Sequence, residues 1–330
     1  MLPRRTGPLE RALGSRPAVS RREAMLGLSA LTLGVSGVGC EASSASGPRA
    51  AAASEPASGP GAARSATAGD RMPVVFVGHG SPTLAVDAAK GAELRRWGAS
   101  LTNARGVLVV SAHWAHHGGE LLLGPLERSP LIYDFYGFPR ELYQVSYAAP
   151  GGAPLAAEVN EVLASVQRAS SVRQTDRGLD HGSWTPLVHL FPAANVPVLQ
   201  LSLPIDWGGA GWFELGASLA PLRERGIVVM GSGNVTHNLR RIDPNPSAPV
   251  PSWAREFDAW AEGALSGRDL SEVARFAERA PALATNHPTL EHLAPLVVAA
   301  GAASASGARA RFPIQGWEHG SISRRSVEFS

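Results

Sequence analysis

Val74-Val75-Phe76-Val77 is an unbroken apolar run that leads directly into Gly78-His79-Gly80-Ser81. A short apolar run without polar alternation predicts a strand that is buried on both faces. Comparable runs occur further along the chain, the last one close to its end: residues 107–110, 196–203, 227–230 and 321–329. Strands that are covered on both faces are typical of a parallel sheet in a layered α/β domain.

Stretches with a helical pattern separate these strands. They cover residues 85–97, 153–168, 211–223, 252–265 and 288–300. Because strands alternate with helices, we predict an α/β fold: a single domain with a mostly parallel central sheet and helices on both of its faces. The sequence has no internal repeat and no second domain boundary, so we expect this domain to span residues 71–330.

Three histidines stand where predicted strands end. His79 follows the first strand, His113 the second and His237 the fourth. In an open parallel sheet, ligands bind in the crevice outside the carboxyl ends of the strands, so these side chains are expected to meet. A neutral imidazole is the commonest metal ligand near neutral pH. The pattern predicts a metal site with nitrogen and oxygen ligands, which suits zinc or ferrous iron.

Two further histidines are candidates for the same site. His181 lies on a loop that leads into a helix, where an imidazole can act as a general acid or base. His292 is expected on a helix that Pro288 begins, and either His292 or the adjacent Glu291 completes the metal sphere. An aromatic loop, residues 133–139, either walls a pocket for a flat ring or packs onto its own domain. Four other histidines are interpreted as peripheral or structural: His116, His117, His189 and His319.

Composition excludes several classes of function. The formal net charge is only +2, which argues against a nucleic-acid partner because such proteins carry a strong basic excess. The chain has a single cysteine, Cys40. An intrachain disulfide and a thiolate metal cluster are therefore impossible.

The first 40 residues are predicted to be a twin-arginine export signal, with an ordinary secretory signal as the alternative. Arg21-Arg22 precede an apolar stretch, residues 25–38, that is too short and too rich in glycine and serine to span a bilayer. Cys40 follows this stretch, as the lipidated cysteine follows the apolar segment of a lipoprotein signal. Such sites usually carry leucine three residues before the cysteine, where this chain has Gly37. Residues 41–70 are mostly Ala, Ser, Gly and Pro and predict a flexible linker. We expect a periplasmic protein or one anchored to the envelope through a lipid on Cys40.

Seven motifs occur in one order along the predicted domain: Pro73-Val-Val-Phe-Val-Gly-His-Gly-Ser-Pro82, Val110-Ser-Ala-His-Trp114, Asp134-Phe-Tyr-Gly-Phe-Pro139, Tyr147-Ala-Ala-Pro-Gly151, Asp180-His-Gly-Ser-Trp184, Gly231-Ser-Gly-Asn-Val-Thr-His-Asn-Leu239 and Pro288-Thr-Leu-Glu-His292. Each motif alone is of moderate specificity, but seven in order are highly specific. Together they resemble the class III extradiol ring-cleavage dioxygenases, in the 4,5-DOPA dioxygenase-like branch. The resemblance covers about residues 72–329.

The resemblance implies a site with one divalent metal per chain. His79 and His113 match family ligands, and His292 matches the position of the remaining ligand, although a related branch has a Glu there. His237 matches a histidine that is treated either as a ligand or as an acid/base beside the metal. His181 matches a histidine that contacts substrate or oxygen.

The resemblance also implies an activity: opening of a catechol ring with O2. Ring cleavage in the wider family uses Fe2+, whereas bacterial members of this branch resemble zinc proteins when isolated. The expected partners are a small aromatic diol and O2; the sequence leaves the oligomeric state open. Two other readings remain, a zinc-dependent hydrolase on the same scaffold and an envelope lipoprotein that binds a catechol or a metal without turnover.

Overall fold

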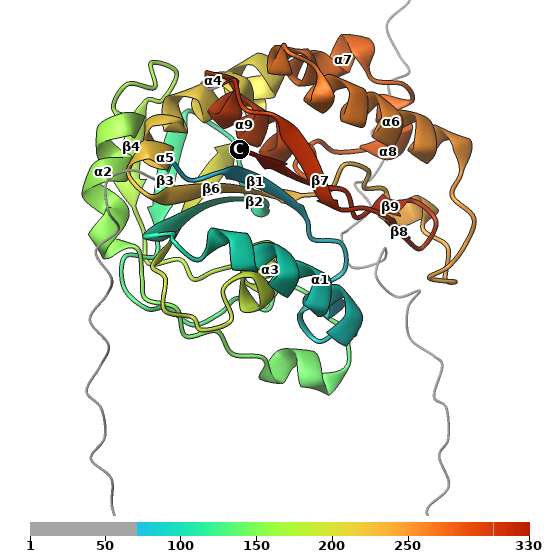
Figure 1. Ribbon diagram of the computed structural model, residues 1–330, viewed down its shortest axis with the longest axis horizontal. Helices are drawn as coiled ribbons and strands as arrows, with labels where there is room; N and C mark the ends of the chain where they lie inside the picture. Colours follow the sequence, from blue (N-terminus) through green and yellow to red (C-terminus); the bar gives the residue numbers. More distant parts are fainter. Residues whose placement is uncertain (1–70, 306) are drawn as a thin grey trace, which may run out of the picture.

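The computed structural model describes residues 71–305 and 307–330. Its centre is an eight-stranded sheet with the order β4-β3-β5-β2-β6-β1-β10-β7 (Figure 1). The four neighbours β5, β2, β6 and β1 run parallel, whereas β10 joins β1 and β3 joins β5 in antiparallel fashion. The prediction of an α/β domain with a mostly parallel sheet is therefore confirmed.

The strands have the following bounds: β1 Val74–Gly78, β2 Gly106–His116, β3 Glu120–Gly124, β4 Ser171–Gln174, β5 Val198–Pro204, β6 Ile227–Gly233, β7 Ala310–Ile314, β10 Ser326–Phe329 and, in a separate two-stranded sheet, β8 Trp317–Glu318 and β9 Ile322–Ser323. The α-helices are α1 Ala88–Gly98, α2 Ala153–Leu163, α3 His181–Leu190, α4 Gly208–Leu219, α5 Pro221–Glu224, α6 Ser252–Ser266, α7 Phe276–Arg279, α8 Leu283–Asn286 and α9 Ala294–Ser304. Short 3-10 helices are η2 Pro82–Ala85, η3 Ala99–Leu101, η4 Arg140–Gln144, η5 Ile205–Trp207, η6 Leu239–Arg241 and η7 Leu270–Arg275.

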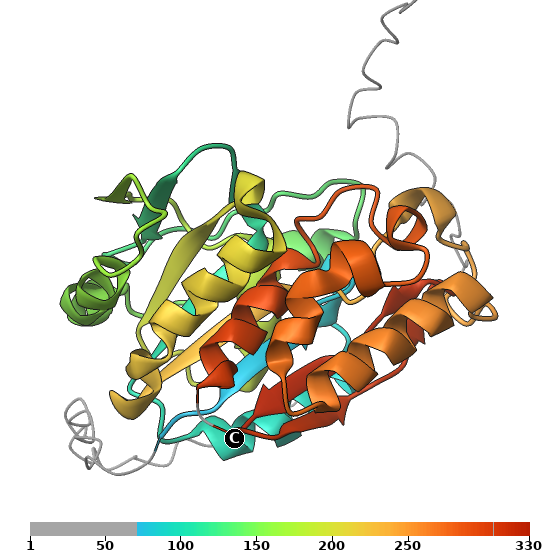
Figure 2. The same ribbon diagram turned by 90° about the horizontal axis from the view of Figure 1, so that it is seen from above.

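Helices cover both faces of the sheet. Helices α1 and α3 lie on one face, and α4, α6 and α9 form a layer on the other (Figures 1 and 2). Alternate residues of one strand enter different cores: Val75 packs with the α1 and α3 side, and Phe76 with the α9 side. Both are fully buried. This explains why the central strands lack polar alternation, because neither face meets water.

The carboxyl ends of the central strands meet in register. Gly78 of β1 pairs with Gly233 of β6, and Ser111 of β2 pairs with Ser232 of β6. Strand β2 continues beyond the predicted run, and its pairing with β5 shifts between Val110 and Ala115. A shift of this kind bends a strand and redirects its side chains. The candidate histidines gather at this edge.

Three helix predictions were wrong in their bounds. The helix predicted over residues 153–168 ends at Leu163. The helix predicted over residues 288–300 begins only at Ala294, because the carbonyl of His292 accepts a hydrogen bond from the backbone N–H of Asn234, 2.9 Å away, in place of a helical partner. The helix predicted over residues 211–223 is divided into α4 and α5 at Pro221, whose ring cannot continue a helical hydrogen-bond ladder.

The predicted export signal (residues 1–40), its Cys40 and the predicted linker (residues 41–70) lie outside the described residues. Within the described part, no helix combines the length and the apolar character that crossing a membrane requires.

Candidate metal centre

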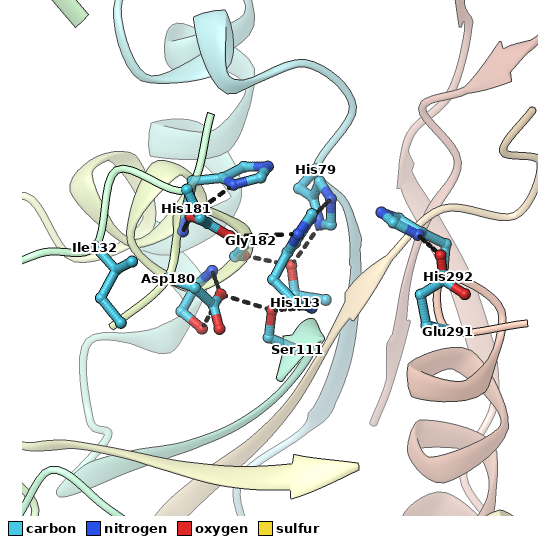
Figure 3. A network of polar contacts seen from close by, with 12 residues as sticks. His79, Ser111, His113, Ile132, Asp180, His181, Gly182, Glu291 and His292 are labelled. Carbon is cyan, nitrogen blue, oxygen red and sulfur yellow. Dashed lines mark hydrogen bonds and ion pairs between the residues drawn. The ribbon is translucent and has the colours of Figure 1, made fainter. Parts of the chain in front are cut away.

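Three histidines from distant parts of the chain bring their ring nitrogens together. One ring nitrogen of each of His79, His113 and His292 lies within 4.8 Å of those of the other two. His79 directly follows β1, His113 lies in the irregular part of β2, and His292 lies in the turn before α9. Figure 3 shows the three rings turned toward one another. The predicted convergence of strand-end histidines is observed for His79 and His113, and the third member of this group is His292.

The hydrogen bonds of His79 determine which of its nitrogens is available. Its Nδ1 lies 3.0 Å from Ser232 Oγ, and that hydroxyl donates its one hydrogen to the carbonyl of Gly182. Ser232 must therefore accept from His79, so Nδ1 carries the hydrogen and Nε2 keeps its lone pair. A histidine that is anchored through one nitrogen in this way presents the other nitrogen as a fixed ligand.

A cation fits between His79 and His113. Their Nε2 atoms lie 3.2 Å apart, and the Nδ1 of His113 lies 3.4 Å from the Asp134 carboxylate. Two nitrogens at about 2.1 Å from one ion, seen from it at about 100°, would be about 3.2 Å apart. The donor set is purely imidazole, which suits zinc or iron.

His292 is held rigidly beside them. The backbone of its loop lies against β6, where a Cβ on Gly233 would be only 2.2 Å from the His292 carbonyl oxygen. The Nδ1 of His292 lies 3.4 Å from Glu291 Oε1 in a geometry that forms no hydrogen bond, and it is buried without a partner among the described residues. The other ring nitrogen of His292 is the one turned toward His79 and His113, which fits a ring that is oriented for a ligand (Figure 3). Glu291 is turned to the outside of the ring group, where Thr289 donates to its carboxylate.

The floor of the site is the first turn of α3. Gly182 lies beneath the rings: a Cβ there would be 2.6 Å from Ser111 Oγ and 2.8 Å from Cδ2 of His113. Asp180 caps the helix and is fully buried, accepting hydrogen bonds from Ser111 and Ser183 on one oxygen and from Arg177 and Gln200 on the other. This cap fixes α3 to β2 and β5, and so positions the turn below the metal group.

His181 forms a pair with Asp134 at the side of the group. The Nδ1 of His181 lies 2.9 Å from Asp134 Oδ1, which also accepts from the His181 backbone N–H at 3.0 Å. Burial alone would raise the pKa of the Asp134 carboxyl, but the hydrogen bond from His181 and the charges of His181 and His113 outweigh it and lower that pKa to about 2. The ionised Asp134 accepts, so the Nε2 of His181 is left free.

His237 lies outside the close group. Its ring stacks on that of His292, with centroids 3.5 Å apart and planes inclined by 7°. The backbone N–H of His237 donates to the carbonyl of Asn286 at 3.1 Å, which fixes the loop after β6. The structure thus brings all five candidate histidines to one edge of the sheet, with His79, His113 and His292 as the innermost members.

Burial keeps these rings neutral. Loss of solvation, followed by the mutual repulsion of neighbouring histidines, lowers the pKa of His113 to about 4 and that of His237 to about 3. The same two causes hold the pKa values of His79 and His292 well below the ordinary range. A neutral imidazole has a lone pair to give to a metal, so the cluster is prepared for one at neutral pH.

Aromatic side chains from the predicted loop stand next to His181. The ring of Phe135 meets His181 edge-on, with centroids 5.5 Å apart, and Tyr133 packs against Phe135 at 6.1 Å. Phe135 is buried, whereas Tyr136 is 46% exposed. The loop therefore packs on its own domain and places Phe135 against His181.

The chain matches one protein family over nearly its whole described part. A family model described as "Catalytic LigB subunit of aromatic ring-opening dioxygenase" covers residues 76–329. The chain belongs to this family of extradiol dioxygenases. The resemblance found in the motifs is confirmed, and membership makes the chain an enzyme of the ring-opening dioxygenase class.

Named relatives agree with this assignment. Proteins called 4,5-DOPA dioxygenase extradiol are 36% identical in Beta vulgaris, over 77% of this chain and 95% of the relative, and 36% identical in Escherichia coli K12, over 78% and 94%. A crystal structure of an uncharacterized protein from Escherichia coli K12 superposes with a TM-score of 0.65 at 32% identity. It covers 79% of this chain and is itself covered completely.

Proposed function

We propose that this chain is a metal-dependent extradiol dioxygenase that opens the ring of a catechol-type, DOPA-like aromatic with O2. The observation that carries the proposal is the group of three neutral, anchored imidazoles, which could hold one divalent ion. We assign His79, His113 and His292 as the ligands. The names of the relatives support a DOPA-like substrate.

The metal ion and the protein side chains would have different roles in the reaction. A bound divalent ion would supply Lewis-acid binding of the two catechol oxygens and, as iron rather than zinc, the redox chemistry that O2 requires. His181 would accept a proton from a substrate hydroxyl at Nε2, because its Nδ1 is engaged by Asp134. Asp134 would stabilise the imidazolium that forms and hold the ring in orientation.

A second acid/base role is assigned to His237. Burial and the neighbouring histidines lower its pKa to about 3, so it meets the substrate as a neutral ring. It is rigidly stacked on His292, so a proton that it accepts stays next to the metal group. The aromatic rings of Phe135 and its neighbours would exclude water from the side where the catechol ring lies.

Iron reconstitution tests the proposal directly. Purified protein is loaded anaerobically with Fe2+, mixed with a catechol and then exposed to O2, while O2 uptake and the yellow ring-opened product are followed. We expect both signals with iron and neither with zinc. A hydrolase would give neither signal with either metal, and a binding lipoprotein would form only the catechol complex; either result would overturn the proposal.

We further propose that residues 1–40 direct export by the twin-arginine route, that residues 41–70 link this segment to the catalytic domain, and that Cys40 carries a lipid. The paired arginines before an apolar stretch support this. Cell fractionation tests it: Arg21→Lys with Arg22→Lys should retain the protein inside the cell. Cys40→Ser should move a lipid-anchored form into the soluble fraction, and an unchanged distribution of both variants would contradict the proposal.

A further inference from the structure

A hollow with a volume of about 780 Å³ begins one residue beyond His237. Its wall includes Asn238, Thr285 and Pro288. The side-chain amide of Asn238 donates to the carbonyl of Thr285 at 2.6 Å, and the next residue, Asn286, accepts from the backbone of His237. The hollow and the candidate metal centre therefore share one stretch of backbone, and they lie at the same edge of the sheet.

The side chains that line this hollow carry more positive than negative charge. Arg240 and Arg241 both line it, and both are exposed. Neither guanidinium forms an ion pair with a carboxylate of residues 71–305 or 307–330. Asp243 also lines the hollow, but one of its carboxylate oxygens already accepts from the backbone of Asn245. Two arginines face one acid, so an anion is favoured here.

A second part of the wall, at His319, is held in a fixed conformation. His319 has a φ of 51°, a left-handed conformation that non-glycine residues rarely adopt. Its Nδ1 donates to the Asp243 carbonyl at 2.8 Å, and the backbone N–H of Asp243 donates to the His319 carbonyl at 3.0 Å. A strained residue that is held by reciprocal hydrogen bonds often marks a preformed binding surface. Pro249, Pro251 and Trp253 add apolar wall beside the arginines.

We propose that this hollow binds the carboxylate of the substrate, so that the enzyme selects catechols that bear an acidic side chain. The inference rests on the proposed function, because it assumes that the diol end binds at the metal centre. A guanidinium matches a carboxylate in shape and donates two parallel hydrogen bonds to it. The aliphatic part of the side chain would lie against the prolines and Trp253.

A matched pair of probes tests the inference. The acid is 3-(3,4-dihydroxyphenyl)propanoate, and the control is its primary amide, which keeps the diol and the shape but lacks the charge. In the iron-reconstituted full chain we expect KM for the acid to be about tenfold below that for the amide. In the double variant Arg240→Gln, Arg241→Gln, that ratio should fall to near one.

Arg268→Gln is the matched control variant, because Arg268 is also exposed but does not line the hollow. It should keep the wild-type ratio. A ratio that survives in the double variant, or that is near one in the wild type, overturns the inference. Thermal unfolding of each variant shows that the exposed substitutions leave the fold intact.

A binding measurement separates this inference from the proposed function. Calorimetric Kd values for the acid and the amide are taken on zinc-loaded protein, which needs no turnover. If iron-loaded protein opens no catechol ring but the double variant still removes a tenfold preference in Kd, the dioxygenase proposal fails and the carboxylate site stands. If ring opening occurs while the Kd ratio is near one throughout, the carboxylate site fails alone.

Discussion

His189 and His79 are both buried histidines, and they differ in how their ring nitrogens are used. In His189, Nδ1 accepts from Arg95 at 3.0 Å and Nε2 donates to the carbonyl of Leu84 at 2.9 Å. In His79, Nδ1 is anchored on Ser232, but Nε2 faces only another imidazole, that of His113. Both ring nitrogens of His189 therefore have a hydrogen-bond partner within the protein, whereas the Nε2 of His79 is left available for a ligand from outside it.

The same contrast exists within one strand. His116 of β2 uses Nδ1 on the carbonyl of His117 and Nε2 on Ser202, both at 3.0 Å. His113, three residues earlier, points its Nε2 at His79. One unpartnered ring nitrogen is not enough to indicate a metal ligand. The buried Nδ1 of His287 also lacks a hydrogen-bond partner among the described residues, and the ring of His287 packs on Phe257. Convergence of several spare nitrogens is what distinguishes a ligand group.

Removing a convergent ring should have the largest effect. We expect His79→Ala and His113→Ala each to abolish metal retention, because two anchored imidazoles remain where three are needed. Metal per chain is measured by elemental analysis and folding by circular dichroism. His116→Ala is the control and should retain the metal. Full retention in both His79→Ala and His113→Ala would remove the basis of the site.

Removing His181 should separate proton transfer from metal binding. His181 does not belong to the group of His79, His113 and His292, so His181→Ala should keep the metal. Turnover of a catechol by the iron-loaded protein should fall about 10²- to 10⁴-fold, the usual value of a general acid or base. Asp134→Asn should lose less, since the ring remains. Unchanged turnover in His181→Ala would withdraw the role assigned to it.

Gly182→Ala tests whether the rings depend on the floor beneath them. The new Cβ would be 2.8 Å from His113 Cδ2, so the ring must move away from its partners. We expect metal affinity to fall about 10- to 100-fold, the range known for changes just outside a ligand set. Competition with a chelator measures it. In Gly263→Ala the new Cβ meets nothing within 4 Å, so this variant should bind metal as the wild type does.

The smallest expected effect concerns His189, whose two ring nitrogens both have hydrogen-bond partners within the protein. Burial lowers the pKa of His189, so below about pH 6.5 the unfolded chain takes up a proton that the folded protein does not. The free energy of unfolding should therefore fall as pH drops from 6.5, by at most about 1.4 kcal/mol per pH unit for this group. His189→Gln should make this fall shallower in urea denaturation between pH 5 and 7, and the other buried histidines should account for the fall that remains. His117→Gln, at a side chain that is 85% exposed, should not.

Much of the fold follows from apolar runs, because buried parallel strands cannot alternate. Some of the elements that were not predicted are exposed. Strand β4 has no buried residue, so its sequence carries little signal. Strand β3 was not predicted either, although two of its leucines are buried. A helix was expected after residue 180, but the bounds of α3 were not predicted, because Asp180 at its start and Pro186 within it are residues typical of loops.

The site was predictable where it depends on strand ends and not where it depends on loops. His79 and His113 follow apolar runs, so topology alone brought them together. The choice between His292 and Glu291 required the turn that Asn234 holds in place. Asp134 appeared only as part of an aromatic loop, and no pattern in the sequence indicates that this loop folds back onto His181.

The neighbours of β1 have a consequence for biosynthesis. The first strand of the sheet lies between β6 and β10, and β10 is formed by residues 326–329. Val327 and Phe329 are fully buried beside it. Pairings that span about 250 residues form slowly, so a nascent chain must keep β1 unpaired on this side until the residues of β10 have emerged from the ribosome. Chaperones would have their longest opportunity to hold this protein before its sheet closes.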